Sequence, residues 1–135
     1  FALSESSPLM GAAMAPLFSL GLSPVFVHNI ALLLALTLNG LAAYGLLRSF
    51  RLHWLSAIAG GAMMVMLPAV HQEMGTLNFV PLFGILWTLG AMNRFSRAPS
   101  WKTGLVVAMF YAMTFLLCMQ YALFLAMTAL RSCFR

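Results

Sequence analysis

Three groups of polar side chains stand out in this otherwise apolar chain as candidates for chemistry. The first, His71-Gln72-Glu73, places an imidazole and a carboxylate two residues apart. Such a pair can coordinate a divalent ion, or can hold a phosphate-bearing head group through that ion or through a protonated histidine. His71 and Glu73 are therefore the candidate catalytic residues. The alternative is a solvated turn between helices, which is the commoner outcome for a motif this short.

The other two groups are His28-Asn29 and Gln120-Tyr121, each inside an apolar stretch. Both are candidates for lining a cavity. The alternatives are interfacial polar residues at a helix start for the first pair and hydrogen bonds between helices for the second. Asn39 lies deeper, and a buried amide in an apolar helix usually bonds to a neighbouring helix, so we expect it to be structural.

Composition sets the class of protein. Hydrophobic residues make up 63% of the chain, charged residues only 7%, and the mean hydropathy is +0.98. Soluble domains carry about 25% charged residues, so this composition excludes an ordinary soluble domain. The formal net charge is +5, but no basic run or stripe is present, so we expect no nucleic-acid partner.

Apolar stretches predict an all-α, integral membrane helical bundle formed by residues 1–135 as one domain. The stretch from Val25 to Leu47 holds no charge and, at about 1.5 Å per residue, is long enough to cross a bilayer. Ser23-Pro24 provides a helix cap and a first-turn proline. We expect about four transmembrane helices after a short interfacial or broken helix over 8–22, with spans at 25–47, 54–70, 74–93 and 103–130.

Two of the predicted spans contain a proline, and the last one is longer than a bilayer requires. Pro68 is expected to end or kink the second, and Pro81 to kink the third. The last span, 28 residues without a charge, would be about 42 Å long, more than the hydrocarbon needs. We expect one long helix here. The alternative is a chain that folds back near Cys118 to Gln120.

Basic residues predict the orientation. Five of the seven lie in two loops, 48–53 and 94–102, which two spans separate. The positive-inside rule makes these loops cytoplasmic and the 71–73 loop extracytoplasmic, in the inner membrane. Arg131 and Arg135 disagree if 103–130 crosses once, because they would then emerge outside.

The order of these features resembles the middle of a bacterial multi-spanning membrane protein of the GT-C glycosyltransferase type. The matching positions extend over nearly the whole chain, and they are Pro24 and Asn29, Gly40 and Tyr44, His71, Leu77-Asn78 with Pro81-Leu82, and Tyr121 to Phe124.

The resemblance implies transfer of a sugar from a polyprenyl-phosphate donor on the extracytoplasmic face, possible use of a divalent metal ion, and contact with membrane lipid and with further transmembrane helices. His28, Asn29, Gln120 and Tyr121 would then line the donor-lipid groove. The family's acidic residue follows its first helix, a region that we expect to precede Phe1. We therefore expect this segment alone to be inactive. The alternative is a non-catalytic membrane module, such as a transporter segment or an assembly subunit.

Overall fold

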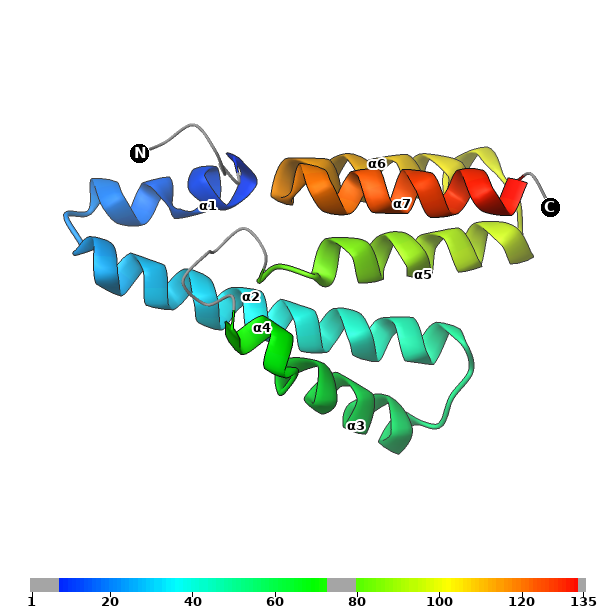
Figure 1. The fold of residues 1–135 in the computed structure, drawn as a ribbon, viewed down its shortest axis with the longest axis horizontal. Helices are drawn as coiled ribbons and strands as arrows, with labels where there is room; N and C mark the ends of the chain where they lie inside the picture. The colour runs from blue at the N-terminus through cyan, green and yellow to red at the C-terminus, as the bar shows by residue number, and fades with distance from the viewer. Residues whose placement is uncertain (1–7, 73–79, 134–135) are drawn as a thin grey trace.

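The computed structural model describes residues 8–72 and 80–133, which form a bundle of α-helices (Figure 1). In chain order the helices are α1 (Pro8–Ser19), α2 (Pro24–Ser49), α3 (Trp54–Val65), α4 (Pro68–Gln72), α5 (Phe83–Arg97), α6 (Trp101–Leu117) and α7 (Met119–Cys133). The axes of helices α2, α3, α5, α6 and α7 lie roughly along one line, and successive helices of this set run in opposite directions. Helix α1 lies against the first half of α2 and the C-terminal end of α6.

The longest helix, α2, begins where the sequence predicts. The Ser23 hydroxyl accepts a hydrogen bond from the Phe26 N–H at 3.4 Å, and Pro24 occupies the first turn. Three alanines at helical spacing, Ala31, Ala35 and Ala42, are buried to 2% exposure or less. The prediction of a short first helix is also confirmed, since α1 ends before Gly21, whose φ of +76° suits glycine.

The second predicted span is interrupted. Helix α3 ends at Val65, and α4 starts at Pro68, so the proline interrupts the helix as expected. Small residues let α3 approach α2 closely. A Cβ built on Gly61 would lie 2.8 Å from the carbonyl oxygen of Gly40. The two backbones therefore touch at this crossing.

The prediction that residues 74–93 form one helix kinked at Pro81 was wrong, because residues 80–82 are not helical; the predicted start at residue 74 lies outside the described residues. Helix α5 begins at Phe83, after Pro81, so the proline precedes the helix and does not kink it. The buried Asn39 side chain stabilises this start. Its amide donates to the Val80 carbonyl at 2.7 Å, and its oxygen accepts from the Phe83 N–H at 2.8 Å. The prediction that Asn39 bonds to a neighbouring helix is confirmed.

The prediction of one long helix over 103–130 was also wrong. Cys118 is extended (φ −155°, ψ 112°), and α7 folds back antiparallel to α6 (Figure 1). The Tyr111 hydroxyl donates to the Ala122 carbonyl at 3.3 Å across this reversal. The reversal buries Leu117, Cys118 and Ala122 at 8% exposure or less, which accounts for a break where the sequence has neither glycine nor proline.

Helices α5 and α6 are joined by buried hydroxyl groups. The Thr88 and Thr114 oxygens lie 3.1 Å apart, and both side chains are 1% exposed. Each hydroxyl oxygen also lies 2.8 Å from the carbonyl oxygen four residues before it in its own helix, that of Gly84 or Phe110. Because a hydroxyl has one hydrogen, one threonine donates to the other threonine and the second donates to the carbonyl of its own helix. The polar groups in this interface are therefore paired.

The basic residues of two loops lie at one end of the bundle, and the fold-back of α7 adds Arg131 to them. The α2–α3 loop, the α5–α6 loop and the end of α7 lie at the same end, which we call the cationic end (Figure 1). It carries Arg48, Arg51, Arg94, Arg97 and Lys102, together with Arg131 in the last turn of α7. The disagreement over Arg131 is thereby removed.

The α2–α3 hairpin closes in an unusual way. Arg51 has a φ of +64°, in the left-handed region, and its N–H donates to the Arg48 carbonyl at 3.0 Å. The Leu52 N–H donates to the Leu47 carbonyl at 3.4 Å. This is the pattern of a Schellman helix end, in which glycine is the usual left-handed residue.

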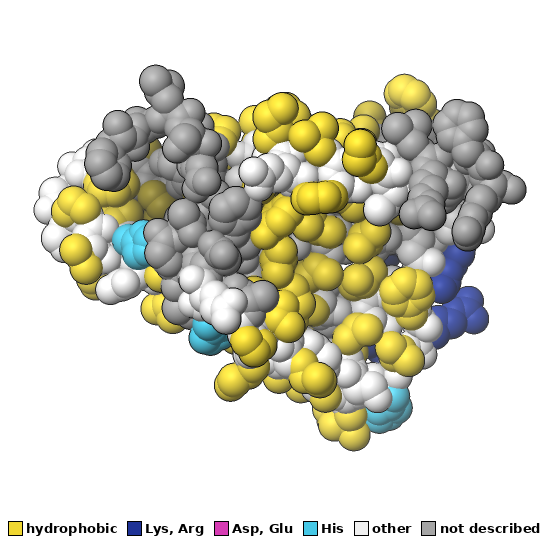
Figure 2. All heavy atoms as spheres, in the orientation of Figure 1, with side chains coloured by type: hydrophobic (Ala, Val, Ile, Leu, Met, Phe, Trp, Pro, Cys, Tyr) yellow, Lys and Arg dark blue, Asp and Glu magenta, His cyan; other side chains and the backbone are white. Residues whose placement is uncertain are grey.

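Two stretches of the described chain are long and apolar enough to cross a membrane, Pro24–Ser49 and Trp54–Gln72. Helices α6 and α7 are apolar but shorter. Large apolar side chains are exposed on the outer faces of these helices, among them Leu33, Met63, Leu105 and Met127, each more than half exposed. Figure 2 shows hydrophobic side chains spread over one face of the bundle.

Replacing Asn39 tests the contact that begins α5. Asn39→Leu would leave the Val80 carbonyl and the Phe83 N–H buried without this partner, so we expect a loss of about 2 kcal/mol in the free energy of unfolding, or a drop of about 5–10 °C in Tm. Thermal melting of the intact protein in detergent measures this. Asn29→Leu, at an exposed position of the same helix, is the control, and an equal Tm for the two variants would contradict the assigned role.

Replacing Gly61 tests the crossing of α2 and α3. Gly61→Ala inserts a methyl group against the Gly40 backbone, which we expect to cost about 1–3 kcal/mol. The same change at Gly45 meets no atom within 4 Å and improves helix propensity, so we expect Gly45→Ala to keep or raise Tm. If both variants melted alike, the close crossing would not contribute to stability.

Candidate functional site

The polar residues singled out from the sequence lie away from the cationic end. His28 and Asn29 are in the first half of α2, and His71 and Gln72 are in α4, which follows the far end of α3. His28 is half-buried, whereas Asn29, His71 and Gln72 are exposed. Glu73 lies outside the described residues.

Gln120 and Tyr121 lie in the same half of the molecule, just after the α6–α7 reversal. Both belong to the first turn of α7, at the end opposite the cationic end (Figure 1). Gln120 is exposed and Tyr121 is half-buried. We call these residues, His28, Asn29, His71, Gln120 and Tyr121, the opposite-end group. They lie in the half of the bundle away from the cationic end, and none of them lines the cavity described below.

A metal site is not formed by the described residues alone. Among residues 8–72 and 80–133, no group of three His, Cys, Asp or Glu side chains is close enough to hold an ion. Cys118 is a buried free thiol beside the helix reversal. A divalent ion therefore has no assigned ligand set here.

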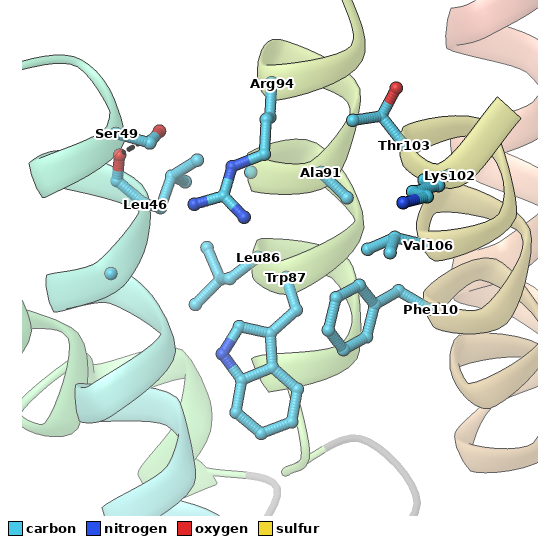
Figure 3. Close-up of a pocket in the computed structure, with 12 residues that line it drawn as sticks. Leu46, Ser49, Leu86, Trp87, Ala91, Arg94, Lys102, Thr103, Val106 and Phe110 are labelled. Atoms are coloured by element: carbon cyan, nitrogen blue, oxygen red, sulfur yellow. Dashed lines mark hydrogen bonds between the residues drawn. The ribbon is translucent and has the colours of Figure 1, made fainter. Parts of the chain in front are cut away.

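A cavity that the sequence reasoning missed lies at the cationic end. It has a volume of about 300 Å³, is open on one side, and is lined by α2, α5 and α6 (Figure 3). Its walls are apolar and come from all three helices. They include Leu46 of α2, Leu86, Trp87 and Ala91 of α5, and Val106 and Phe110 of α6.

Aromatic rings form the deep part of this cavity. The Trp87 and Phe110 ring centroids are 5.7 Å apart at an interplanar angle of 40°, and Phe83 meets the other side of Trp87 edge-on at 5.3 Å. Figure 3 shows both rings at the far side of the cavity from the cations.

Two cations line the other part of the cavity. The Arg94 guanidinium extends from α5 toward α2, and the Lys102 ammonium projects from the first turn of α6 (Figure 3). Both side chains are exposed. Helix α6 starts here with a capping box, in which the Ser100 hydroxyl accepts from the Thr103 N–H at 3.2 Å. The positive end of the α6 dipole therefore lies beside Lys102.

Spacing within the helices explains how these residues come to share the cavity. Arg94 follows Trp87 by seven residues, and Phe110 follows Lys102 by eight, so each pair shares one helix face about two turns apart. An aromatic residue two turns from a basic residue, in both helices of a hairpin, is the sequence signal that could have identified this cavity.

Comparison with known proteins gives a family but no described relative. No curated protein and no solved structure matches the chain. One family model matches residues 2–135, nearly the whole chain, and its description is "Domain of unknown function (DUF6311)". The chain therefore belongs to the DUF6311 family.

Proposed function

We propose that the bundle is embedded in the bacterial inner membrane with its cationic end in the cytoplasm. Three observations support this proposal: the large apolar side chains exposed along α2, α3, α6 and α7, the two helical stretches long enough to span, and the gathering of basic residues at one end. Trp54 and Trp101, which are 50% and 85% exposed, lie beside the two basic loops. Exposed tryptophans at such a position suit the interface between lipid and water.

Cysteine labelling tests this orientation. Ser96 and Gln72 are both exposed and lie at opposite ends of the bundle. In a protein whose Cys118 and Cys133 are replaced by alanine, we expect Gln72→Cys to react with an impermeant maleimide in intact cells. Ser96→Cys should react only after the membrane is permeabilised. Labelling of position 96 alone in intact cells would show that the protein has the opposite orientation. Equal labelling of both positions would contradict the proposed orientation.

We also propose that the chain is part of a glycosyltransferase that takes a sugar from a polyprenyl-phosphate donor on the extracytoplasmic face. The resemblance of motif order to GT-C enzymes supports the activity. The observation that carries it to this fold is the opposite-end group, whose members come from α2, α4 and α7 and lie in the half of the bundle away from the cations.

The residues of this group suit binding of a phosphate more than bond-breaking. A protonated His71 or His28 can donate to a phosphate oxygen of the donor and can offset its charge. Gln120 and Asn29 add neutral amide donors. The acidic residues of the chain, Glu5 and Glu73, lie outside the described residues, so the geometry assigns no general base.

A transfer assay with a matched histidine pair tests this role. Membranes that carry the intact protein are given polyprenyl-phosphate hexoses and pentoses, and incorporation of sugar into acceptor is measured. His71→Ala, alone and with Glu73→Gln, should reduce transfer about tenfold through loss of a charge-assisted hydrogen bond. The control is His53→Asn, at the cationic end, which keeps an acceptor for the Leu55 N–H. Equal transfer by the His71 and His53 variants would remove His71 from the site.

A non-catalytic membrane module is the second candidate. It is favoured by the helix breaks at Met66-Leu67 and at Cys118, because interrupted helices are typical of transporters. Uptake of a sugar or its phosphate into proteoliposomes, without sugar transfer to any acceptor in the membrane assay, would select this candidate over the glycosyltransferase.

A further inference from the structure

The cavity at the cationic end combines two cations with a long apolar interior. By helix rise, Trp87 lies about 10 Å deeper than Arg94 along α5, and Phe110 lies about 12 Å deeper than Lys102 along α6. A ligand that fills this space must therefore carry negative charge at one end and be apolar over the next 10 Å or so.

The positive charge in the cavity is not neutralised within the described chain. The only acidic residues of the sequence, Glu5 and Glu73, both lie outside the described residues. Within the described part, no hydrogen bond or ion pair is made by the Arg94 guanidinium or the Lys102 ammonium. By contrast, Arg48 donates to the Leu52 carbonyl at 2.8 Å, and Asn93 donates to the Ser49 hydroxyl at 3.1 Å. The neighbouring polar side chains are thus occupied, and these two cations are available to an anion.

We propose that this cavity binds an anionic membrane phospholipid, with its head group in the part of the cavity that Arg94 and Lys102 line and one acyl chain against Trp87 and Phe110. Basic pockets between helices on the cytoplasmic side are a recognised way of holding such head groups. The inference depends on the proposed membrane orientation and not on sugar transfer.

The apolar depth favours a lipid over a free anion. A soluble phosphate would use only the two cations and the first turn of α6, leaving the walls formed by Leu46, Leu86 and Val106 without an occupant. An acyl chain gains free energy from those walls in proportion to the apolar area that it covers.

Two glycines keep the cavity open. A Cβ at Gly45 would meet no atom within 4 Å, and a Cβ at Gly90 would meet only Leu46 Cδ1, at 3.8 Å. Both residues line the cavity. A larger side chain at Gly45 should therefore occupy the lipid position without displacing the backbone, which supplies a variant that retains both cations.

Fluorescence quenching of Trp87 measures lipid contact inside the cavity. The intact protein, with tryptophans other than Trp87 replaced by phenylalanine, is reconstituted in phosphatidylcholine vesicles that contain brominated phosphatidylglycerol or brominated phosphatidylcholine. We expect brominated phosphatidylglycerol to bind about tenfold more tightly, because each cation near a phosphate favours the anionic lipid. Equal quenching by the two lipids would overturn the proposal.

Three variants test whether the cations and the open volume of the cavity cause the preference for phosphatidylglycerol. In the double variant Arg94→Gln, Lys102→Gln, the ratio of the affinities for phosphatidylglycerol and phosphatidylcholine should fall to about one. The double variant Arg51→Gln, Arg97→Gln removes the same charge at the same end but outside the cavity, so it should keep the preference. Gly45→Leu should abolish the preference although both cations remain. A preference that survived Gly45→Leu would place the lipid elsewhere and overturn the proposal.

Inorganic phosphate separates a lipid site from a site for soluble anions. Millimolar phosphate should leave the quenching by brominated phosphatidylglycerol unchanged. Full displacement of the lipid by phosphate would show a soluble-anion site and contradict the lipid assignment. Since the assay measures no sugar transfer, loss of lipid preference with transfer intact overturns only this inference. Preference retained without any transfer overturns only the enzyme proposal.

Discussion

The bundle depends on one buried amide. Asn39 sits in the middle of α2 with no exposed surface, and its side chain bonds to Val80 and Phe83, on either side of Pro81. Proline at this point leaves the chain short of one backbone donor, and the first turn of α5 has N–H groups without helical partners. Asn39 fills part of this deficit. Because α5 packs against α2, α6 and α7, the contact fixes the helix that joins the two halves of the fold.

Much of the first half could be predicted because its signals are local. Ser23 and Pro24 define the start of α2, three alanines define its buried face, and Pro68 interrupts the helix that follows. The reversal at Cys118 could not be found in this way. No glycine or proline is present there, and the break depends on burial of residues that meet only after the chain has turned.

The cavity was missed for a similar reason. Its walls come from residues between 45 and 110 on three helices, and each residue alone is an ordinary apolar or basic side chain. The opposite-end group was predicted from residue type, and the fold places its members at one end without joining them in a described cavity. In the proposed orientation the two faces of the membrane would thus carry different chemistry: amide and imidazole side chains outside, and arginine and lysine side chains inside.

In the proposed membrane orientation, the closure of the α2–α3 hairpin would affect how the chain enters the bilayer. Arg51 occupies a left-handed position that costs an L-residue about 1–2 kcal/mol and that glycine would accept freely. The loop is therefore less stable than it would be with glycine at position 51, and it carries a guanidinium at its tip. Drawing that tip through hydrocarbon would cost at least about 2.5 kcal/mol for the arginine alone. A residue that is unfavourable for the turn thus resists translocation of the hairpin, so insertion in the opposite sense is disfavoured before α5 has been made.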